Sequence, residues 1–269
     1  MGHFAPKPKR RVMDGYDELC ARWKALRGVR DVRVREVACV NAPRTMLCVE
    51  TGGSELPVIA LAAGVHGDER AGPWALLSLV EGDLLDSRFA YRIWPCTNPS
   101  GYVLRTRVSA DGVDVNRTFG RGGTSPEARA ILAANRDRTF LLSLDLHEDS
   151  DACGFYCYEY GGGDVGRAAI DALDRAGMPI DPLAATFQAA GPLSDEDCRR
   201  ERGRIVADAA VEARRLDGIS YTMAIARRGA RCALTFESPA GAAWESRLAM
   251  HAVAVRAAIA ASGFAREGV

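Results

Sequence analysis

The stretch Gly64-Val65-His66-Gly67-Asp68-Glu69 places an imidazole and a carboxylate three residues apart at the end of an apolar run. Residues 56–63, before it, have the composition of a buried strand, and residues 70–80, after it, are predicted to form a helix. At such a corner one turn of chain directs both side chains toward one point. Nitrogen and carboxylate oxygen are ligands of Zn²⁺, so the pair is half of a zinc site. The alternative is an ordinary helix start with Glu69 at the positive end of the helix dipole.

A catalytic zinc ion needs a third protein ligand, and the chain has only four histidines. His3 lies in a basic leader, and His251 lies in an alanine-rich helical pattern. His147 alone resembles His66 in context, because it directly follows a predicted buried strand at residues 139–146.

Glu237 follows another predicted strand, at residues 231–236, so three strands end in a polar residue. In open α/β sheets ligands bind at the carboxyl ends of the strands. We therefore expect His66, His147 and Glu237 to converge at one edge of the sheet.

The elements that must position these residues alternate along the chain. Further strands are predicted at residues 32–37, 45–50, 89–95 and 154–160, and helices at 14–27, 124–137, 165–176, 194–215 and 242–261. Asn98-Pro99-Ser100-Gly101 has the composition of a turn. This alternation predicts a three-layer α/β/α sandwich with a mixed, largely parallel central sheet.

Length and charge limit the partners. The 269 residues are 48% hydrophobic, and no stretch resembles a long linker, so we expect one domain over residues 1–269. Lysine plus arginine (35) equal aspartate plus glutamate (35), which gives no global field for nucleic acid or an anionic membrane. Residues 1–12 lack the apolar core of a signal peptide, and no run of about 18 apolar residues occurs. We expect a cytoplasmic protein with small partners.

Eight cysteines are scattered through strand and helix patterns. The nearest pair, Cys153 and Cys157, is separated by four residues of an alternating segment, or about 13 Å at roughly 3.3 Å per residue. That distance is too long for a mutual bridge, so free thiols are predicted.

Residues 102–123 lack a sustained period yet are rich in side chains that perform chemistry. They include Arg107, Asp114, Asn116 and Arg117. An ordered loop over an active site is the expected location for such a mixture.

Five pieces occur in order over residues 64–239, and together they resemble a known family. They are the His66–Glu69 corner, Asn98-Pro99-Ser100-Gly101, residues 107–119, Asp145-Leu146-His147-Glu148 and Thr235-Phe236-Glu237-Ser238-Pro239. The sequence is similar to the zinc carboxypeptidases of the funnelin type and to their relatives, the succinylglutamate desuccinylases, aspartoacylases and murein-peptide amidases.

This resemblance implies a role for each matched position. His66, Glu69 and His147 would bind one zinc ion and leave its fourth position to a water molecule of lowered pKa. Asp114 would orient the imidazole of His66 through its other nitrogen. Glu237 would be the general base.

The loop residues would contact the substrate. The resemblance implies that Arg107 stabilises the tetrahedral oxyanion and that Asn116 and Arg117 bind a substrate carboxylate. Tyr221 is either a cap on the pocket or simply a core or rim aromatic. Glu148 and Asp149 are interpreted as rim acids or as carboxylates behind the ligands.

Two departures affect specificity. Digestive carboxypeptidases carry an arginine, used for substrate contact, where this chain has Asp68. The 32 residues after Glu237 are predicted to form one helix, which leaves no room for the extra C-terminal β-domain of the aspartoacylase branch. We therefore expect a zinc-dependent metallocarboxypeptidase-like hydrolase that cleaves a peptide or amide bond next to a carboxylate by attack of a metal-bound water. The alternatives are an N-acyl amino acid deacylase, a murein-peptide amidase and a non-catalytic zinc- or carboxylate-binding module.

Overall fold

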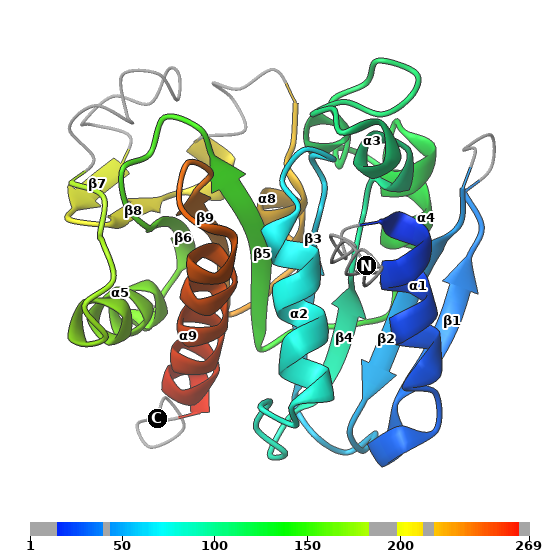
Figure 1. Ribbon diagram of the computed structural model, residues 1–269, viewed down its shortest axis with the longest axis horizontal. Coiled ribbons are helices and arrows are strands. Elements are labelled where there is room, and N and C mark those ends of the chain that lie inside the picture. Colours follow the sequence, from blue (N-terminus) through cyan, green and yellow to red (C-terminus); the bar gives the residue numbers. More distant parts are fainter. Residues whose placement is uncertain (1–14, 40–43, 183–197, 212–217, 264–269) are drawn as a thin grey trace, which may run out of the picture.

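A mixed sheet forms the centre of the computed structural model, which describes residues 15–39, 44–182, 198–211 and 218–263. Nine strands in the described residues follow the order β1-β2-β4-β3-β5-β9-β6-β8-β7 (Figure 1). The four central strands are parallel to one another. They are β4 (Ala90–Trp94), β3 (Val58–Ala63), β5 (Leu142–Asp149) and β9 (Cys232–Pro239). The predicted fold class is confirmed.

The outer strands complete the sheet on both sides. At one edge, β1 (Arg33–Val37) and β2 (Met46–Thr51) are antiparallel to each other, and β2 is antiparallel to β4. On the other side, β6 (Tyr156–Gly161) is antiparallel to β9 and parallel to β8 (Arg204–Ala207), and β7 (Cys198–Glu201) forms the edge.

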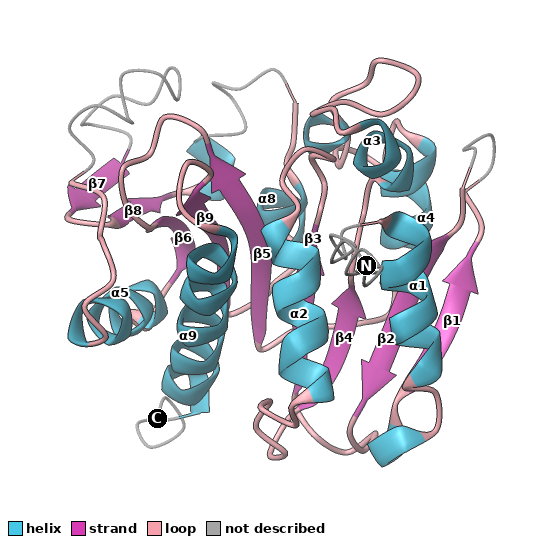
Figure 2. Cartoon of the chain, in the orientation of Figure 1, coloured by secondary structure: helices cyan, strands magenta, loops and turns pink. Residues whose placement is uncertain are grey.

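Helices cover both faces of the sheet (Figures 1 and 2). One face packs against α1 (Tyr16–Ala25), α2 (Ala71–Glu81), α5 (Val165–Arg175) and α9 (Trp244–Gly263). The opposite face packs against α4 (Pro126–Ala134) and α8 (Tyr221–Ala226). Alternation along β3 explains the two cores, since Leu61 points into the first and its neighbours Ala60 and Ala62 point into the second.

The predicted helix over residues 194–215 is wrong over residues 198–207, although residues 209–211 are helical. Residues 198–207 form the antiparallel hairpin of β7 and β8, while residues 194–197 and 212–215 lie outside the described part. Gly203 has a φ of +71°, which suits a tight turn between two strands. Ile205 and Ala207 are buried and Val206 less so, a period of two that the surrounding arginines obscured.

The predicted turn at Asn98–Gly101 is instead the start of helix α3 (Pro99–Leu104). The side-chain oxygen of Asn98 accepts a hydrogen bond from Gly101 N at 2.9 Å. Proline at the first helical position and asparagine at the cap are typical of a helix start as well as of a turn.

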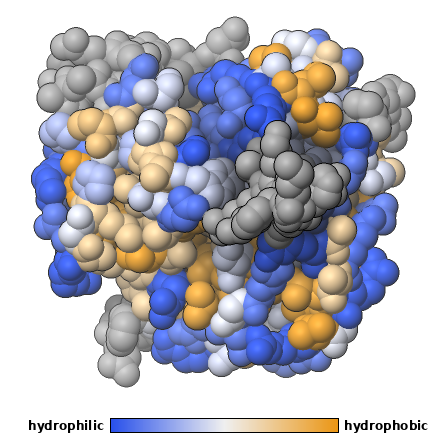
Figure 3. Space-filling model, viewed as in Figure 1, coloured by the Kyte–Doolittle hydropathy of each residue, from blue (hydrophilic) through white to orange (hydrophobic). Residues whose placement is uncertain are grey.

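All eight cysteines are free thiols. Within the described ranges, no helix has the length and apolarity needed to cross a membrane. The surface in Figure 3 is largely hydrophilic, with an apolar patch over α3, where Val103 and Leu104 are exposed.

Candidate metal centre

His66 and Glu69, which are three residues apart, meet the distant His147 at the carboxyl ends of β3 and β5. The Nδ1 atom of His66 lies 2.5 Å from Oε1 of Glu69, and Nδ1 of His147 lies 2.8 Å from Oε2 of Glu69. The facing atoms of the three side chains lie within 4.8 Å of one another, and all three residues are buried. In the described part of the chain this is the one such group of histidine, cysteine and carboxylate side chains that could hold a metal ion.

The corner that carries His66 and Glu69 depends on two glycines. Gly64 has a φ of +65°, in the left-handed region that disfavours a side chain. A Cβ atom on Gly67 would lie 1.9 Å from the carbonyl carbon of Gly101, so only glycine lets the corner pack against α3.

Asn98 joins this corner to the loop that carries Arg107. Its side-chain nitrogen donates to the carbonyl oxygen of Val65 at 3.2 Å and lies 3.4 Å from that of Arg107, to which it also donates. Asn98 is fully buried. The second sequence piece therefore braces His66 and Arg107 against each other.

The second ring nitrogens of the two histidines face carboxylates. Nε2 of His66 lies 3.4 Å from Oδ1 of Asp114, and Nε2 of His147 lies 3.0 Å from Oδ2 of Asp145. Protonated Nε2 atoms would be stabilised there, which leaves the Nδ1 lone pairs pointing at Glu69. The three inner groups are then all electron-pair donors, and such an arrangement fits a bound cation.

The charges of the centre lead to the same conclusion. Burial raises the pKa of Glu69, but the two facing imidazoles outweigh burial and hold it well below its usual range. Burial lowers the pKa of His147, yet the carboxylates of Asp145 and Glu69 outweigh burial and raise it well above its usual value. The centre thus attracts positive charge strongly.

Arg107 lies beside this centre with its side chain 48% exposed. Its Nε and Nη2 atoms donate to Oδ2 of Asp114 at 3.2 and 3.1 Å, and Nη1 lies 3.3 Å from Nδ1 of His66. Burial raises the pKa of Asp114, but His66, Arg107 and Arg117 together hold it well below its usual range. Asp114 therefore stays ionised and fixes both His66 and Arg107.

Asn116 and Arg117 follow on the short 3₁₀ helix Val115–Arg117. Asp114 caps this helix by accepting from Asn116 N at 3.0 Å. Asn116 Oδ1 accepts from Tyr221 N at 3.0 Å, so its amide hydrogens are the part that can bind a ligand. Arg117, which is partly exposed, donates to Asn116 O at 3.1 Å.

Tyr221 is a core aromatic, which is one of the predicted alternatives. Its side chain is 1% exposed, and its ring packs edge-on against Phe119 at a centroid distance of 5.5 Å. A cap on the pocket needs access to the substrate, so this position does not support that role.

Glu237 is the register partner of His147 on the neighbouring parallel strand β9, and Tyr156 is its partner on β6. Burial, together with the carboxylates of Glu69 and Asp149, outweighs the attraction of His147 and raises the pKa of Glu237 well above its usual value. A carboxyl group of raised pKa is suited to accept and return a proton near neutral pH.

Two acidic residues without a defined role in the sequence analysis contact two of the three side chains of the centre. Asp145 precedes His147 by two residues, and strand periodicity places both on one face, which was the available signal. Glu148 was expected at the rim or behind the ligands, and it is only 5% exposed. Its carboxylate accepts from Ala71 N at 2.5 Å and pairs with Arg247, while its backbone N donates to Glu69.

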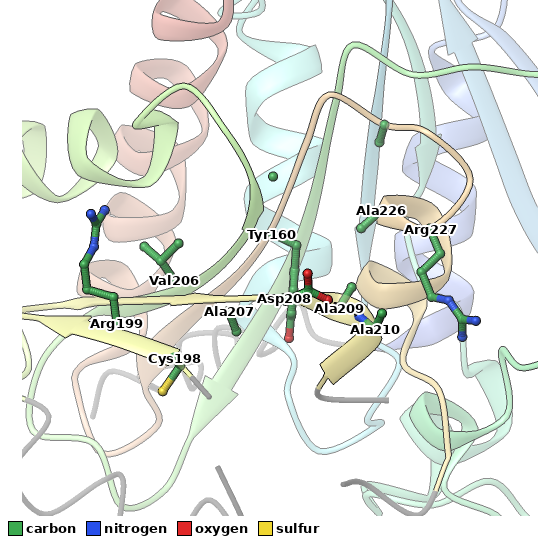
Figure 4. A pocket seen from close by; sticks show the side chains of 12 residues that line it. Tyr160, Cys198, Arg199, Val206, Ala207, Asp208, Ala209, Ala210, Ala226 and Arg227 are labelled. Atoms are coloured by element: carbon green, nitrogen blue, oxygen red, sulfur yellow. Dashed lines mark hydrogen bonds between the residues drawn. The ribbon is translucent and has the colours of Figure 1, made fainter. Parts of the chain in front are cut away.

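A separate cavity of about 830 Å³ lies between β8 and the end of α8 (Figure 4). Tyr160, Cys198 and Arg227 are among its lining residues. Gly161, which also lines it, pairs with Cys232 at the start of β9, whereas Glu237 stands near the end of that strand. This cavity is therefore distinct from the metal centre.

A mixed sheet whose strands deliver a buried His-Glu-His group, with a carboxylate and an arginine beside it, is an arrangement that suits a metal-dependent hydrolase. The family model of the succinylglutamate desuccinylase/aspartoacylase catalytic domain matches residues 55–238. The chain belongs to this family, and the predicted resemblance and enzyme class are confirmed.

Solved structures show the same fold. A protein described as a metallopeptidase from Shewanella denitrificans OS217 superposes with a TM-score of 0.72 at 23% identity, over 92% of this chain and 90% of that one. A metallo-carboxypeptidase from Burkholderia cenocepacia superposes with a TM-score of 0.65 at 18% identity, over 91% and 68%.

A curated relative matches over a shorter stretch. Carboxypeptidase SOL1 from Arabidopsis thaliana is 30% identical over 111 residues. The match covers 34% of this chain and 23% of the relative, so it spans about a quarter of that protein's length.

Proposed function

We propose that the chain is a zinc-dependent hydrolase with one zinc ion per chain, and that it cleaves a peptide or amide bond next to a substrate carboxylate. The observation that carries the proposal is the inward-facing set of His66 Nδ1, His147 Nδ1 and the Glu69 carboxylate. Two imidazoles and one carboxylate are a ligand set of catalytic zinc. Zinc bound there would supply Lewis acidity, which polarises a carbonyl group and acidifies water.

Glu237 is the proposed proton carrier. Its position opposite His147 aims its carboxylate along the same face of the sheet. Glu237 would take a proton from the water that attacks the carbonyl carbon. It would then transfer that proton to the nitrogen that leaves, so the water ends as the acid and the amine departs neutral.

Arg107 and the pair Asn116 and Arg117 are the proposed substrate contacts. Arg107 would donate to the oxyanion that develops on the attacked carbonyl, because its guanidinium is held beside His66 by Asp114. Arg117 would form two parallel hydrogen bonds to the substrate carboxylate, and Asn116 would donate its amide hydrogens to the same group.

Deacylation of an N-acyl amino acid is the second candidate, and family membership favours it. The matched family is named for enzymes that act on succinylglutamate and on acyl-aspartate. The proposed zinc ion, proton carrier and substrate contacts would serve that reaction as well, since the scissile bond is again an amide next to a carboxylate. A murein-type peptide with a D-centre is a third substrate class.

Metal analysis and a substrate panel test the proposal. The purified full chain should contain about one zinc per chain, lose activity with a chelator and regain it with added zinc. The panel should include peptides with a free C-terminal carboxylate, acyl-glutamate, acyl-aspartate and a D-centred tripeptide. If the protein binds no zinc, or if the zinc-loaded protein hydrolyses none of these amides, the proposal fails.

A further inference from the structure

Strand β5 presents a row of polar side chains behind the metal centre. Ser143, Asp145 and His147 alternate along it and therefore share one face, which is the face covered by α8. Oδ2 of Asp145 lies 3.0 Å from Nε2 of His147. Asp145 is only 1% exposed, so it contacts His147 and is not accessible to a substrate.

Three buried polar atoms at this place make no hydrogen bond within the described structure. They are Oδ1 of Asp145, Oγ of Ser143 and the phenolic oxygen of Tyr221. Buried polar atoms are rarely left without a partner. Hydroxyl groups can rotate to satisfy a carboxylate, or one buried water can join the three.

Tyr221 lies at the start of α8, the helix that packs against this part of β5. Burial first, and then the negative charge of Asp145, raise the pKa of the Tyr221 phenol, while contact with Ser143 lowers it. The phenol is therefore protonated at neutral pH and is available as a hydrogen-bond donor toward Asp145.

We propose that Asp145 is a positioning residue for His147, and that the hydroxyl of Tyr221 holds Asp145, directly or through one buried water, so that Nδ1 of His147 faces the metal. The inference rests on the proposed function, because it assigns these residues a role toward the bound ion. Holding Asp145 is a role that Tyr221 can fill although it is buried in the core and has no access to substrate.

The contact chain from Tyr221 through Asp145 to His147 is called the relay below. The substitution Asp145→Asn tests it through the position of the proton on the His147 ring. An ionised carboxylate requires the proton of His147 on Nε2 and leaves the Nδ1 lone pair for the metal. An asparagine can donate to Nε2 instead, which moves the proton to Nδ1 and blocks coordination. Loss of such a partner behind a ligand typically lowers metal affinity by about 10- to 100-fold.

The measurement is the zinc dissociation constant from chelator competition, together with the melting temperature of the metal-free protein. Asp145→Asn should lose about 10- to 100-fold in affinity, and Tyr221→Phe should lose about 3- to 10-fold. Two variants are matched controls. Asp181→Asn changes a buried carboxylate that accepts from Cys153 N, and Tyr16→Phe removes a buried hydroxyl that donates to Thr45 O. The controls should change the melting temperature without changing zinc affinity.

Each outcome decides the proposal. Wild-type zinc affinity in a folded Asp145→Asn variant overturns it, and wild-type affinity in Tyr221→Phe removes Tyr221 from the relay. If Asp145→Asn does not fold, then Tyr221→Phe decides alone. Failure of the wild-type chain to bind zinc would sink the proposed function itself, whereas equal binding by wild type and variants would sink only the relay.

Discussion

His147 and Glu237 stand opposite each other on the neighbouring parallel strands β5 and β9. The distance between the proposed metal ligand and the proposed base is therefore set by the hydrogen-bonded ladder of the sheet rather than by a loop. A group that must pass a proton within one catalytic cycle benefits from such a rigid support.

Glu237→Gln should abolish most of the hydrolysis while zinc remains bound. The amide keeps the shape of the side chain but cannot accept a proton, and general acid–base groups contribute about 10²- to 10⁴-fold in rate. Turnover and zinc content, measured on the same preparation, check this. Activity near wild type would show that another group takes the proton.

Arg107→Ala should lower kcat by about 10²- to 10³-fold with a smaller change in KM, because an oxyanion contact forms mainly in the transition state. Steady-state kinetics on the best substrate of the panel measures both constants. Arg121→Ala, which removes an exposed arginine of the same loop region, is the control and should leave kcat unchanged. A change in KM alone would place Arg107 in substrate binding.

Arg117→Lys should weaken the preference for a free carboxylate. Lysine keeps the charge but loses the two parallel hydrogen bonds of the guanidinium. The measurement compares kcat/KM for a substrate with a C-terminal carboxylate and for the same substrate with a C-terminal amide. The wild-type enzyme should prefer the acid, and the variant should narrow that ratio by about tenfold, or roughly 1.4 kcal/mol. An unchanged ratio would assign carboxylate binding elsewhere.

His251 should make the metal-free protein less stable in mild acid. This histidine is completely buried, and burial lowers its pKa from 6.5 to about 3. Because the folded pKa lies below the unfolded value, only the unfolded state takes up the proton as pH falls from 6.5 toward 3. The stabilisation is therefore present above this window and is lost within it.

The test compares denaturant unfolding of wild type and His251→Leu at about pH 7.5 and pH 5.5. Wild type should lose about 1.4 kcal/mol more than the variant over this interval, which is the cost of one pH unit below the unfolded pKa. Equal losses in the two proteins would mean that the buried ring is protonated in the folded state.

The convergence of His66 and His147, the proposed metal ligands, was predictable because their positions follow from local rules. Each follows an apolar run that has to be a buried strand, and parallel strands place their carboxyl ends at one edge. Sequence periodicity therefore located His66 and His147 without a structure. The alternation of strands and helices likewise sufficed for the three-layer fold.

Other features of the site and the fold depend on tertiary contacts, which could not be predicted from sequence patterns. The role of Asp145 depends on a partner two residues away on a strand face, and the interior position of Tyr221 depends on how α8 docks against β5. The hairpin of β7 and β8 was hidden because five of the seven residues 199–205 are charged arginine or glutamate, which fit a solvated helix equally well.

The two hydrogen bonds that the Asn98 amide donates, to Val65 O and to Arg107 O, have a thermodynamic consequence. Because one side chain serves both segments, its replacement would leave two backbone carbonyl groups without their donor at once. The corner that carries His66 and Glu69 and the loop that carries Arg107 would then lose order together rather than separately.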